Sequence, residues 1–220
     1  MEDPFREELK ALLRDAGVIA VLVIDRLQDA VPLARALVAG GVRVMELTLR
    51  TDCALDALRA IREEVPEMTA GAGTVLTPGQ VAAVSDAGAA FGVSPGLNPR
   101  VVTAAREAGL SFAPGVAVPS DVESALELGC RLLKLFPAEP MGGVAYLKSM
   151  AAPYEHLGVG FVPLGGINTG NLPSYLSEPL ITAIGGSWIA PRDLIVQGDW
   201  SAIEQRAREA RLLVDACRAQ

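Results

Sequence analysis

The chain of 220 residues is 50% hydrophobic and carries a formal net charge of -7 at pH 7. This length supports one sizeable core, so we expect residues 1–220 to form a single domain. An acidic chain without a basic stripe argues against nucleic acid and anionic membranes as partners. Three widely spaced cysteines, with no signal-peptide core and no apolar run of spanning length, predict a cytoplasmic protein.

Short apolar runs alternate with helical patterns along the chain. The expected strands are residues 18–24, 42–48, 68–73, 91–94, 111–114, 131–136, 160–163 and 181–184. The expected helices between and after them are residues 28–39, 53–64, 78–87, 99–108, 120–128, 143–150, 170–176 and 191–196. Helix starts are expected at Thr77-Pro78, Asn98-Pro99 and Ser120-Asp121.

Eight strand–helix units of about 27 residues each are typical of a (β/α)₈ TIM barrel. Helical patterns at residues 4–16 and 200–217 predict one extra helix before the repeat and one after it. An open doubly wound sheet is the alternative. It usually begins with a glycine-rich phosphate loop near the first strand, and residues 18–25 contain none.

The second expected strand carries polar residues on one face. Because side chains alternate along a strand, Val44, Glu46, Thr48 and Arg50 share one face and the intervening apolar residues share the other. The apolar set suits contact with the helices. The polar set, with Glu46 and Arg50, is therefore expected to point into the mouth of the barrel.

The next two strands end in residues that can shape a pocket. Thr74 follows Gly71-Ala72-Gly73 and offers a hydroxyl at the rim. Pro95 lies in the rigid turn Ser94-Pro95-Gly96, which is expected to form part of the pocket floor. Each signal is weak by itself, because such sequences often mark only a turn.

Lys134 is the most informative residue of the chain. It interrupts the apolar run of residues 132–137, where an unpaired ammonium is costly to bury. By alternation, Leu132, Lys134 and Phe136 share the inward face. Lysine is the usual amine for attack on a carbonyl group, so Lys134 with Glu46 nearby predicts Schiff-base chemistry.

Two glycine pairs follow the last two strands. Gly165-Gly166 follows the strand at 160–163, and Gly185-Gly186-Ser187 follows the strand at 181–184. Loops after the seventh and eighth strands are the usual phosphate site of such barrels. The pairs therefore predict that this end of the pocket binds a phosphate.

The sequence has one histidine, His156, in a segment expected to be a loop or helix end at the surface. A Ser-His-Asp triad or a multi-histidine metal site would need more than this one ring. Acid–base chemistry is therefore expected from carboxylates, lysine or water. We expect no metal and no cofactor.

Taken together, the segments at residues 40–51, 71–76, 94–96, 134–139 and 185–188 resemble the class I aldolases that act on 2-keto-3-deoxy-6-phosphogluconate (KDPG) and 4-hydroxy-2-oxoglutarate (KHG). The resemblance covers nearly the whole chain. It implies that Lys134 is the Schiff-base lysine and Glu46 the general acid–base. It also implies that Arg50 and Thr74 bind the pyruvate carboxylate and that Gly165, Gly166 and Ser187 bind the distal phosphate. From their places in the turn and on the inward strand face, Pro95 and Phe136 are expected to bind the substrate as well. A homotrimer of metal-free barrels is implied as well.

The chain departs from this family at two places. Leu164 stands where the family usually has threonine, and Ala20-Val21-Leu22-Val23 stands where many members have proline and then arginine. Neither change touches the chemistry at C2 of the substrate. We expect them to alter recognition of the distal half of the substrate.

The sequence thus predicts a pyruvate-releasing aldolase with a small 2-keto acid as its substrate. KDPG would give pyruvate and glyceraldehyde 3-phosphate, and KHG would give pyruvate and glyoxylate. Two other functions are the alternatives. One is a metal-dependent pyruvate aldolase, and the other is a phosphate-binding barrel such as a sugar-phosphate epimerase.

Overall fold

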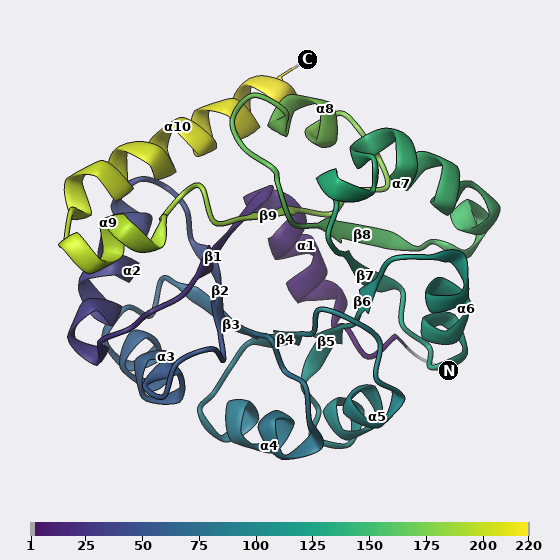
Figure 1. Ribbon diagram of the computed structural model, residues 1–220, viewed down its shortest axis with the longest axis horizontal. Coiled ribbons are helices and arrows are strands. Elements are labelled where there is room, and N and C mark those ends of the chain that lie inside the picture. Colours follow the sequence, from purple (N-terminus) through teal and green to yellow (C-terminus); the bar gives the residue numbers. More distant parts are fainter. Residues whose placement is uncertain (1–2, 220) are drawn as a thin grey trace.

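The computed structural model describes residues 3–219, in which parallel strands alternate with helices that cover them on the outside (Figure 1). The strands are β1 (Val18–Leu22), β2 (Val44–Thr48), β3 (Thr69–Gly73), β4 (Phe91–Val93), β5 (Ser111–Ala113), β6 (Gly115–Val116), β7 (Leu132–Leu135), β8 (Gly160–Pro163) and β9 (Ile184–Gly186).

The α-helices are α1 (Glu7–Ala16), α2 (Ala30–Ala39), α3 (Ala54–Glu64), α4 (Pro78–Asp86), α5 (Pro99–Glu107), α6 (Pro119–Glu127), α7 (Gly143–Ala151), α8 (Leu172–Leu176), α9 (Arg192–Gln197) and α10 (Trp200–Arg218). Three short 3₁₀ helices, which the sequence did not predict, are η1 (Leu27–Asp29), η2 (Glu139–Met141) and η3 (Ala152–Leu157).

The fold is α/β with a curled parallel sheet in two hydrogen-bonded parts. One part has the strand order β5-β4-β3-β2-β1-β9, and the other has the order β6-β7-β8. Only Pro114 separates β5 from β6, and a proline has no N–H for a strand ladder. On the other side, isolated parallel bridges join Phe161 to Ile181 and Leu164 to Gly185.

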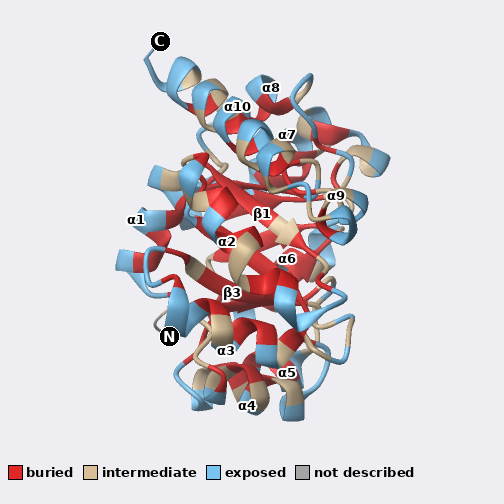
Figure 2. Cartoon of the chain, turned by 90° about the vertical axis from the view of Figure 1, so that its left-hand side faces the viewer, coloured by how far each residue is buried: buried red, intermediate tan, exposed pale blue. Residues whose placement is uncertain are grey.

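Side chains of the strands alternate between two apolar clusters, as the period of two predicts. Met45 and Leu47 of β2 pack in the cluster that the helices share, whereas Val44 packs in an inner cluster with Leu132 of β7. Figure 2 shows the buried strands between helices whose outer faces are exposed. Glu46 therefore lies on the inward face, as the alternation predicts.

The extra N-terminal helix closes one end of the inner cluster. Leu9 and Leu13 of α1, together with the preceding Phe5, are buried there against strand residues such as Phe91. In the view of Figure 1, α1 crosses the middle of the strands. Because α1 covers the amino-terminal ends of the strands, the carboxyl ends remain as the open mouth.

Most expected element bounds agree with the structure to within two residues, and the differences have local causes. Thr77 accepts a hydrogen bond from Gln80 N at 3.2 Å and Asn98 accepts one from Arg100 N at 3.1 Å, so both caps are confirmed. The expected helix start at Ser120 is wrong by one residue, because α6 begins at Pro119.

The eighth expected strand, residues 181–184, is also misplaced. The hydrogen-bonded strand is β9 (Ile184–Gly186), which pairs with β1, and residue 181 forms only an isolated bridge. The apolar run marked the buried segment. The pairing, however, is set by neighbouring β1, and it extends into the glycine pair that was expected to be loop.

Candidate active site

Lys134 and Glu46 meet in the interior of the mouth. Lys134 comes from β7 and Glu46 from β2, and Lys134 Nζ lies 2.8 Å from Glu46 Oε1 and 3.1 Å from Oε2. The side chains are 7% and 3% exposed. A buried ammonium and carboxylate are each costly alone, so this contact lets the core tolerate both. It also gives a proton a direct path between amine and carboxylate.

The neighbouring strand makes room for the Glu46 carboxylate. Thr48 is paired in register with Gly73 of β3, two residues after the pairing of Glu46 with Gly71. A Cβ at Gly73 would collide with the carboxylate of Glu46. The small residues that end β3 therefore allow the carboxylate to reach across toward β7.

Lys134 is flanked by residues that face opposite ways. Leu133 and Leu135 pack in the cluster shared with the helices, while Lys134 points inward. The Phe136 ring lies near the amine, with its centroid 5.8 Å from Lys134 Nζ, within the range of a cation–π contact. Phe136 is 38% exposed, so its ring forms part of the rim.

A cavity of about 220 Å³ opens beside this pair at the carboxyl ends of the strands. The predicted site residues that line it are Glu46, Arg50, Thr74, Pro95, Lys134, Phe136, Gly165 and Ser187. The structure thus brings eight predicted residues to one cavity. Gly166, the ninth, does not line it and instead packs against Glu139.

Thr74 and Arg50 lie on the side of the mouth formed by β2 and β3. Thr74 has a φ of 60°, a left-handed conformation that costs a β-branched residue about 1–3 kcal/mol. Such strain is found most often at functional sites. Arg50 is exposed at the rim, and no other described residue forms an ion pair with its guanidinium.

The turn at Gly165-Gly166 forms another wall of the mouth. Both glycines have positive φ, of 100° and 83°, which side chains rarely tolerate. Ala138 N donates to Leu164 O at 2.7 Å, and Glu139 N donates to Gly165 O at 3.0 Å. These bonds tie the turn to the loop that follows Lys134.

Leu164 also belongs to this wall. Its side chain is 5% exposed, lines the cavity and packs so closely on Gly185 that no Cβ fits there. Ser187, two residues after Gly185, is exposed and lines the same cavity. The wall therefore presents an apolar side chain between backbone groups of two glycine pairs.

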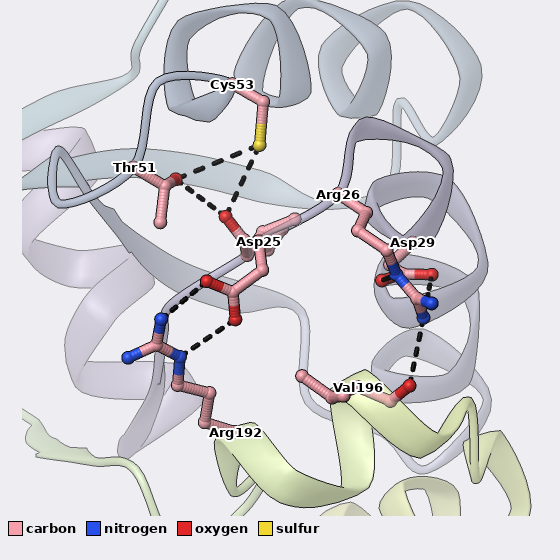
Figure 3. Close-up of polar contacts among 8 residues, drawn as sticks. Asp25, Arg26, Asp29, Thr51, Cys53, Arg192 and Val196 are labelled. Carbon is pink, nitrogen blue, oxygen red and sulfur yellow. Dashed lines mark hydrogen bonds and ion pairs between the residues drawn. The ribbon is translucent and has the colours of Figure 1, made fainter.

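Hydrogen bonds that the sequence did not predict join the segment after β1 to the loop after β2 and to α9 (Figure 3). Ile24 O accepts from Thr51 Oγ1 at 2.6 Å and Cys53 Sγ at 3.4 Å, which joins the segment after β1 to the loop after β2. Next to it, Asp25 Oδ2 accepts from Arg192 Nε of α9 at 2.8 Å. The Arg192 guanidinium lowers the pKa of the Asp25 carboxyl by hydrogen bonding and charge.

Other wall residues were not predicted as site residues. Val21, Val23 and Thr48 line the cavity, and the Thr48 hydroxyl donates to Leu22 O at 2.9 Å. The sequence signal for Thr48 was its place on the same strand face as Glu46 and Arg50. His156 is exposed in η3 and does not line the cavity, in agreement with the prediction of a surface histidine.

Comparisons with known proteins identify the family of this site. The model of the KDPG and KHG aldolase family matches residues 9–206. The chain belongs to the KDPG and KHG aldolase family. The KHG/KDPG aldolase of Escherichia coli is 45% identical over 206 residues, which cover 94% of this chain and 96% of that protein.

Solved structures of aldolases agree with this assignment. The KDPG aldolase of Legionella pneumophila, with pyruvate captured as a covalent carbinolamine, has a TM-score of 0.86 at 40% identity and covers 90% of this chain and 96% of its own. The KDPG aldolase of Zymomonas mobilis with 3-phosphoglycerate has a TM-score of 0.85 at 43% identity, covering 92% and 94%. This chain is accordingly a carbon–carbon lyase.

The side chains and helices of residues 3–219 bear on two other kinds of function. No group of three or more histidine, cysteine, aspartate or glutamate side chains in this part of the chain is placed to hold a metal ion. No helix in the same range is both long enough and apolar enough to cross a membrane. Cys53, Cys130 and Cys217 are free thiols.

Proposed function

We propose that this protein is a class I aldolase that cleaves KDPG to pyruvate and glyceraldehyde 3-phosphate, KHG to pyruvate and glyoxylate, or both. The observation that carries the proposal is the buried contact of 2.8 Å between Lys134 Nζ and Glu46 Oε1 beside the mouth cavity. It pairs an amine nucleophile with a carboxylate that can accept and return its proton.

The first half of the proposed reaction forms an imine. Lys134 Nζ passes a proton to Glu46 and attacks the C2 ketone of the substrate, which gives a carbinolamine. Glu46 then protonates the C2 hydroxyl, and water leaves as the iminium forms. Each such positioned proton transfer typically contributes about 10²–10⁴ in rate.

The second half breaks the C3–C4 bond. Glu46, acting directly or through a water, removes the proton of the C4 hydroxyl, and the electron pair of the C3–C4 bond moves into the iminium. The aldehyde leaves and an enamine remains on Lys134. Protonation at C3 followed by hydrolysis releases pyruvate and restores the amine.

The walls of the cavity suit the two ends of such a substrate. Arg50 and Thr74 are proposed to hold the pyruvate carboxylate, where guanidinium and hydroxyl donors match a carboxylate. Pro95 and Phe136 are proposed to contact the apolar part of the bound pyruvate.

The distal phosphate is proposed to bind at Gly165, Gly166 and Ser187. Backbone N–H groups of a glycine turn and a serine hydroxyl are suitable donors for an anion. The net charge of -7 makes such local donors necessary, because the field of the whole protein repels a phosphorylated acid.

We propose that the two sheet parts form one closed (β/α)₈ barrel with the extra helices α1 and α10, and that residues 1–220 are a single domain. We also propose a cytoplasmic homotrimer, which light scattering with chromatography would test. Free thiols at all three cysteines fit a reducing compartment.

Steady-state kinetics on KDPG, its C4 epimer and KHG, each with and without EDTA, tests the proposed function. We expect pyruvate from at least one of the three compounds and the same rate in EDTA. Loss of activity in EDTA and its return with Mg²⁺ or Mn²⁺ would favour the metal-dependent aldolase. Turnover of a sugar phosphate without release of pyruvate would favour an epimerase.

A further inference from the structure

Glu139 lies where the strand of the lysine meets the glycine turn. It follows Lys134 by five residues, at the start of η2, and its N–H donates to Gly165 O at 3.0 Å. A Cβ at Gly166 would lie 2.6 Å from Glu139 Cβ, so the turn rests directly on this residue. Glu139 therefore contacts both glycines through different atoms.

Holding the carbonyl groups of a turn also aims its N–H groups. In a trans peptide the C=O and the following N–H point in opposite directions within one plane. The bond from Ala138 N to Leu164 O thus fixes the N–H of Gly165, and the bond from Glu139 N to Gly165 O fixes the N–H of Gly166. The segment at Ala138-Glu139 sets the directions of the two donors.

The side chain of Glu139 is itself anchored by a residue of α8. Tyr175 of α8 is fully buried, and its hydroxyl donates a hydrogen bond to Glu139 Oε1. Burial, together with this bond to a carboxylate, raises the pKa of Tyr175. The phenol therefore stays protonated and remains a donor.

The carboxylate of Glu139 is also enclosed by the start of α7. A Cβ at Gly143, which has a φ of 63°, would lie 2.8 Å from Glu139 Oε1 and 3.3 Å from the Tyr175 oxygen. Only glycine leaves room for this pair. The enclosure limits the rotamers of Glu139 and so restrains the backbone that holds the turn.

We propose that Glu139 and Tyr175, the Glu139–Tyr175 brace, are positioning residues that hold the Gly165-Gly166 turn in the geometry that binds the distal phosphate. This inference rests on the proposed function. Neither residue lines the cavity, so the brace acts through the turn and not by contact with substrate. Its loss would affect the phosphorylated substrate and leave imine formation intact.

The test compares Tyr175→Phe with Tyr154→Phe, a matched control. Tyr154 also donates to a glutamate, Glu123 Oε1 at 3.0 Å. Both of its described partners, Glu123 and Pro119 O, belong to α6 and not to the glycine turn. We expect Tyr175→Phe to raise KM for KDPG and the Kd for inorganic phosphate by about 5–50-fold. Its kcat, its KHG kinetics and its borohydride trapping with pyruvate should stay within about twofold of wild type.

Variants of Glu139 provide a second test that does not depend on how well Tyr175→Phe folds. Glu139→Ala removes the acceptor and should reproduce the rise in KM and Kd. Glu139→Gln keeps an oxygen acceptor for Tyr175 and should restore most of the affinity. Thermal unfolding of each variant separates a loss of stability from a loss of phosphate affinity.

Three outcomes would overturn the brace: unchanged phosphate affinity in Tyr175→Phe and Glu139→Ala, an equal rise in KM for KDPG and KHG, or an equal effect of Tyr154→Phe. The calorimetric Kd for inorganic phosphate needs no turnover. If the wild-type protein cleaves neither substrate, the proposed function fails, and these Kd values still decide for or against the brace.

Discussion

At Glu46, a substitution can remove proton transfer while keeping the size of the side chain. Its carboxylate fits beside Gly73 and contacts Lys134 Nζ at 2.8 Å, and glutamine would fill the same space. Glu46→Gln should keep the hydrogen bonding but lose the proton relay. We expect turnover to fall by about 10²-fold or more, while trapping of pyruvate on the enzyme falls far less.

Steady-state turnover and single-turnover borohydride trapping measure these two effects. Glu46→Asp, which keeps a carboxylate on a shorter side chain, is the control and should retain more turnover than Glu46→Gln. Turnover of Glu46→Gln within about threefold of wild type, less than about 1 kcal/mol, would mean that Glu46 is only structural.

Leu164 is the residue expected to govern the distal end of the substrate. It stands at the rim of the cavity, where a threonine hydroxyl could donate to a substrate oxygen near C4 or the phosphate. A hydrogen bond to a charged group contributes about 1.5–3 kcal/mol. Leu164→Thr should therefore raise kcat/KM for KDPG by about 10–100-fold, with a smaller change for KHG.

Leu164→Val is the matched control, since valine has nearly the shape of threonine without the hydroxyl. Both variants lose packing against Gly185, so only the hydroxyl distinguishes them. Kinetics on KDPG, its C4 epimer and KHG give the result. Equal changes for threonine and valine, or equal changes on all three compounds, would show that Leu164 acts through packing alone.

At the scale of elements, the ion pair of Asp25 and Arg192 connects the segment after β1 to α9 (Figure 3). The pKa of Asp25 is lowered in the folded protein by Arg192. The pair therefore stabilises the fold above the ordinary pKa of aspartate, and this contribution is lost as the pH falls through the lowered value.

The measurement is the Tm of wild type and Asp25→Asn over a series from about pH 7 to about pH 2. We expect Asp25→Asn to have the lower Tm at neutral pH and the gap to close in acid. Because the pair is partly exposed, the gap should be small and should shrink with added salt. Asp56→Asn, which breaks an ion pair within α3, is the control for a local pair. A gap that persists at the acid end would show that Asp25 acts through packing.

The sequence predicts best those helix starts that depend only on residues nearby in the chain. Thr77 and Asn98 mark helix starts because their side chains cap the first turn, and this depends on nearby residues alone. The ion pair of Asp25 and Arg192 joins positions 167 residues apart, and only the folded chain brings them together. Likewise, no local pattern links Tyr175 to Glu139.

At the scale of the whole molecule, parallel order explains why the site residues could be predicted together. Strands that run in the same direction end at the same edge, so β2 and β7 deliver Glu46 and Lys134 to one mouth. The alternation of side chains then selects the inward face. Sequence could not give the break of the sheet at Pro114, because a two-residue strand such as β6 has too little pattern.

The central claim is that Lys134 forms the imine, and the chain offers a clear test because it has three lysines, Lys10, Lys134 and Lys148. Incubation with pyruvate and borohydride should reduce one pyruvyl imine, which peptide mass spectrometry can locate. The buried, Glu46-paired Lys134 should carry the adduct, while Lys148, paired with Glu178 and largely exposed, should not. An adduct on Lys10 or Lys148, or active enzyme with no adduct at all, would contradict the account.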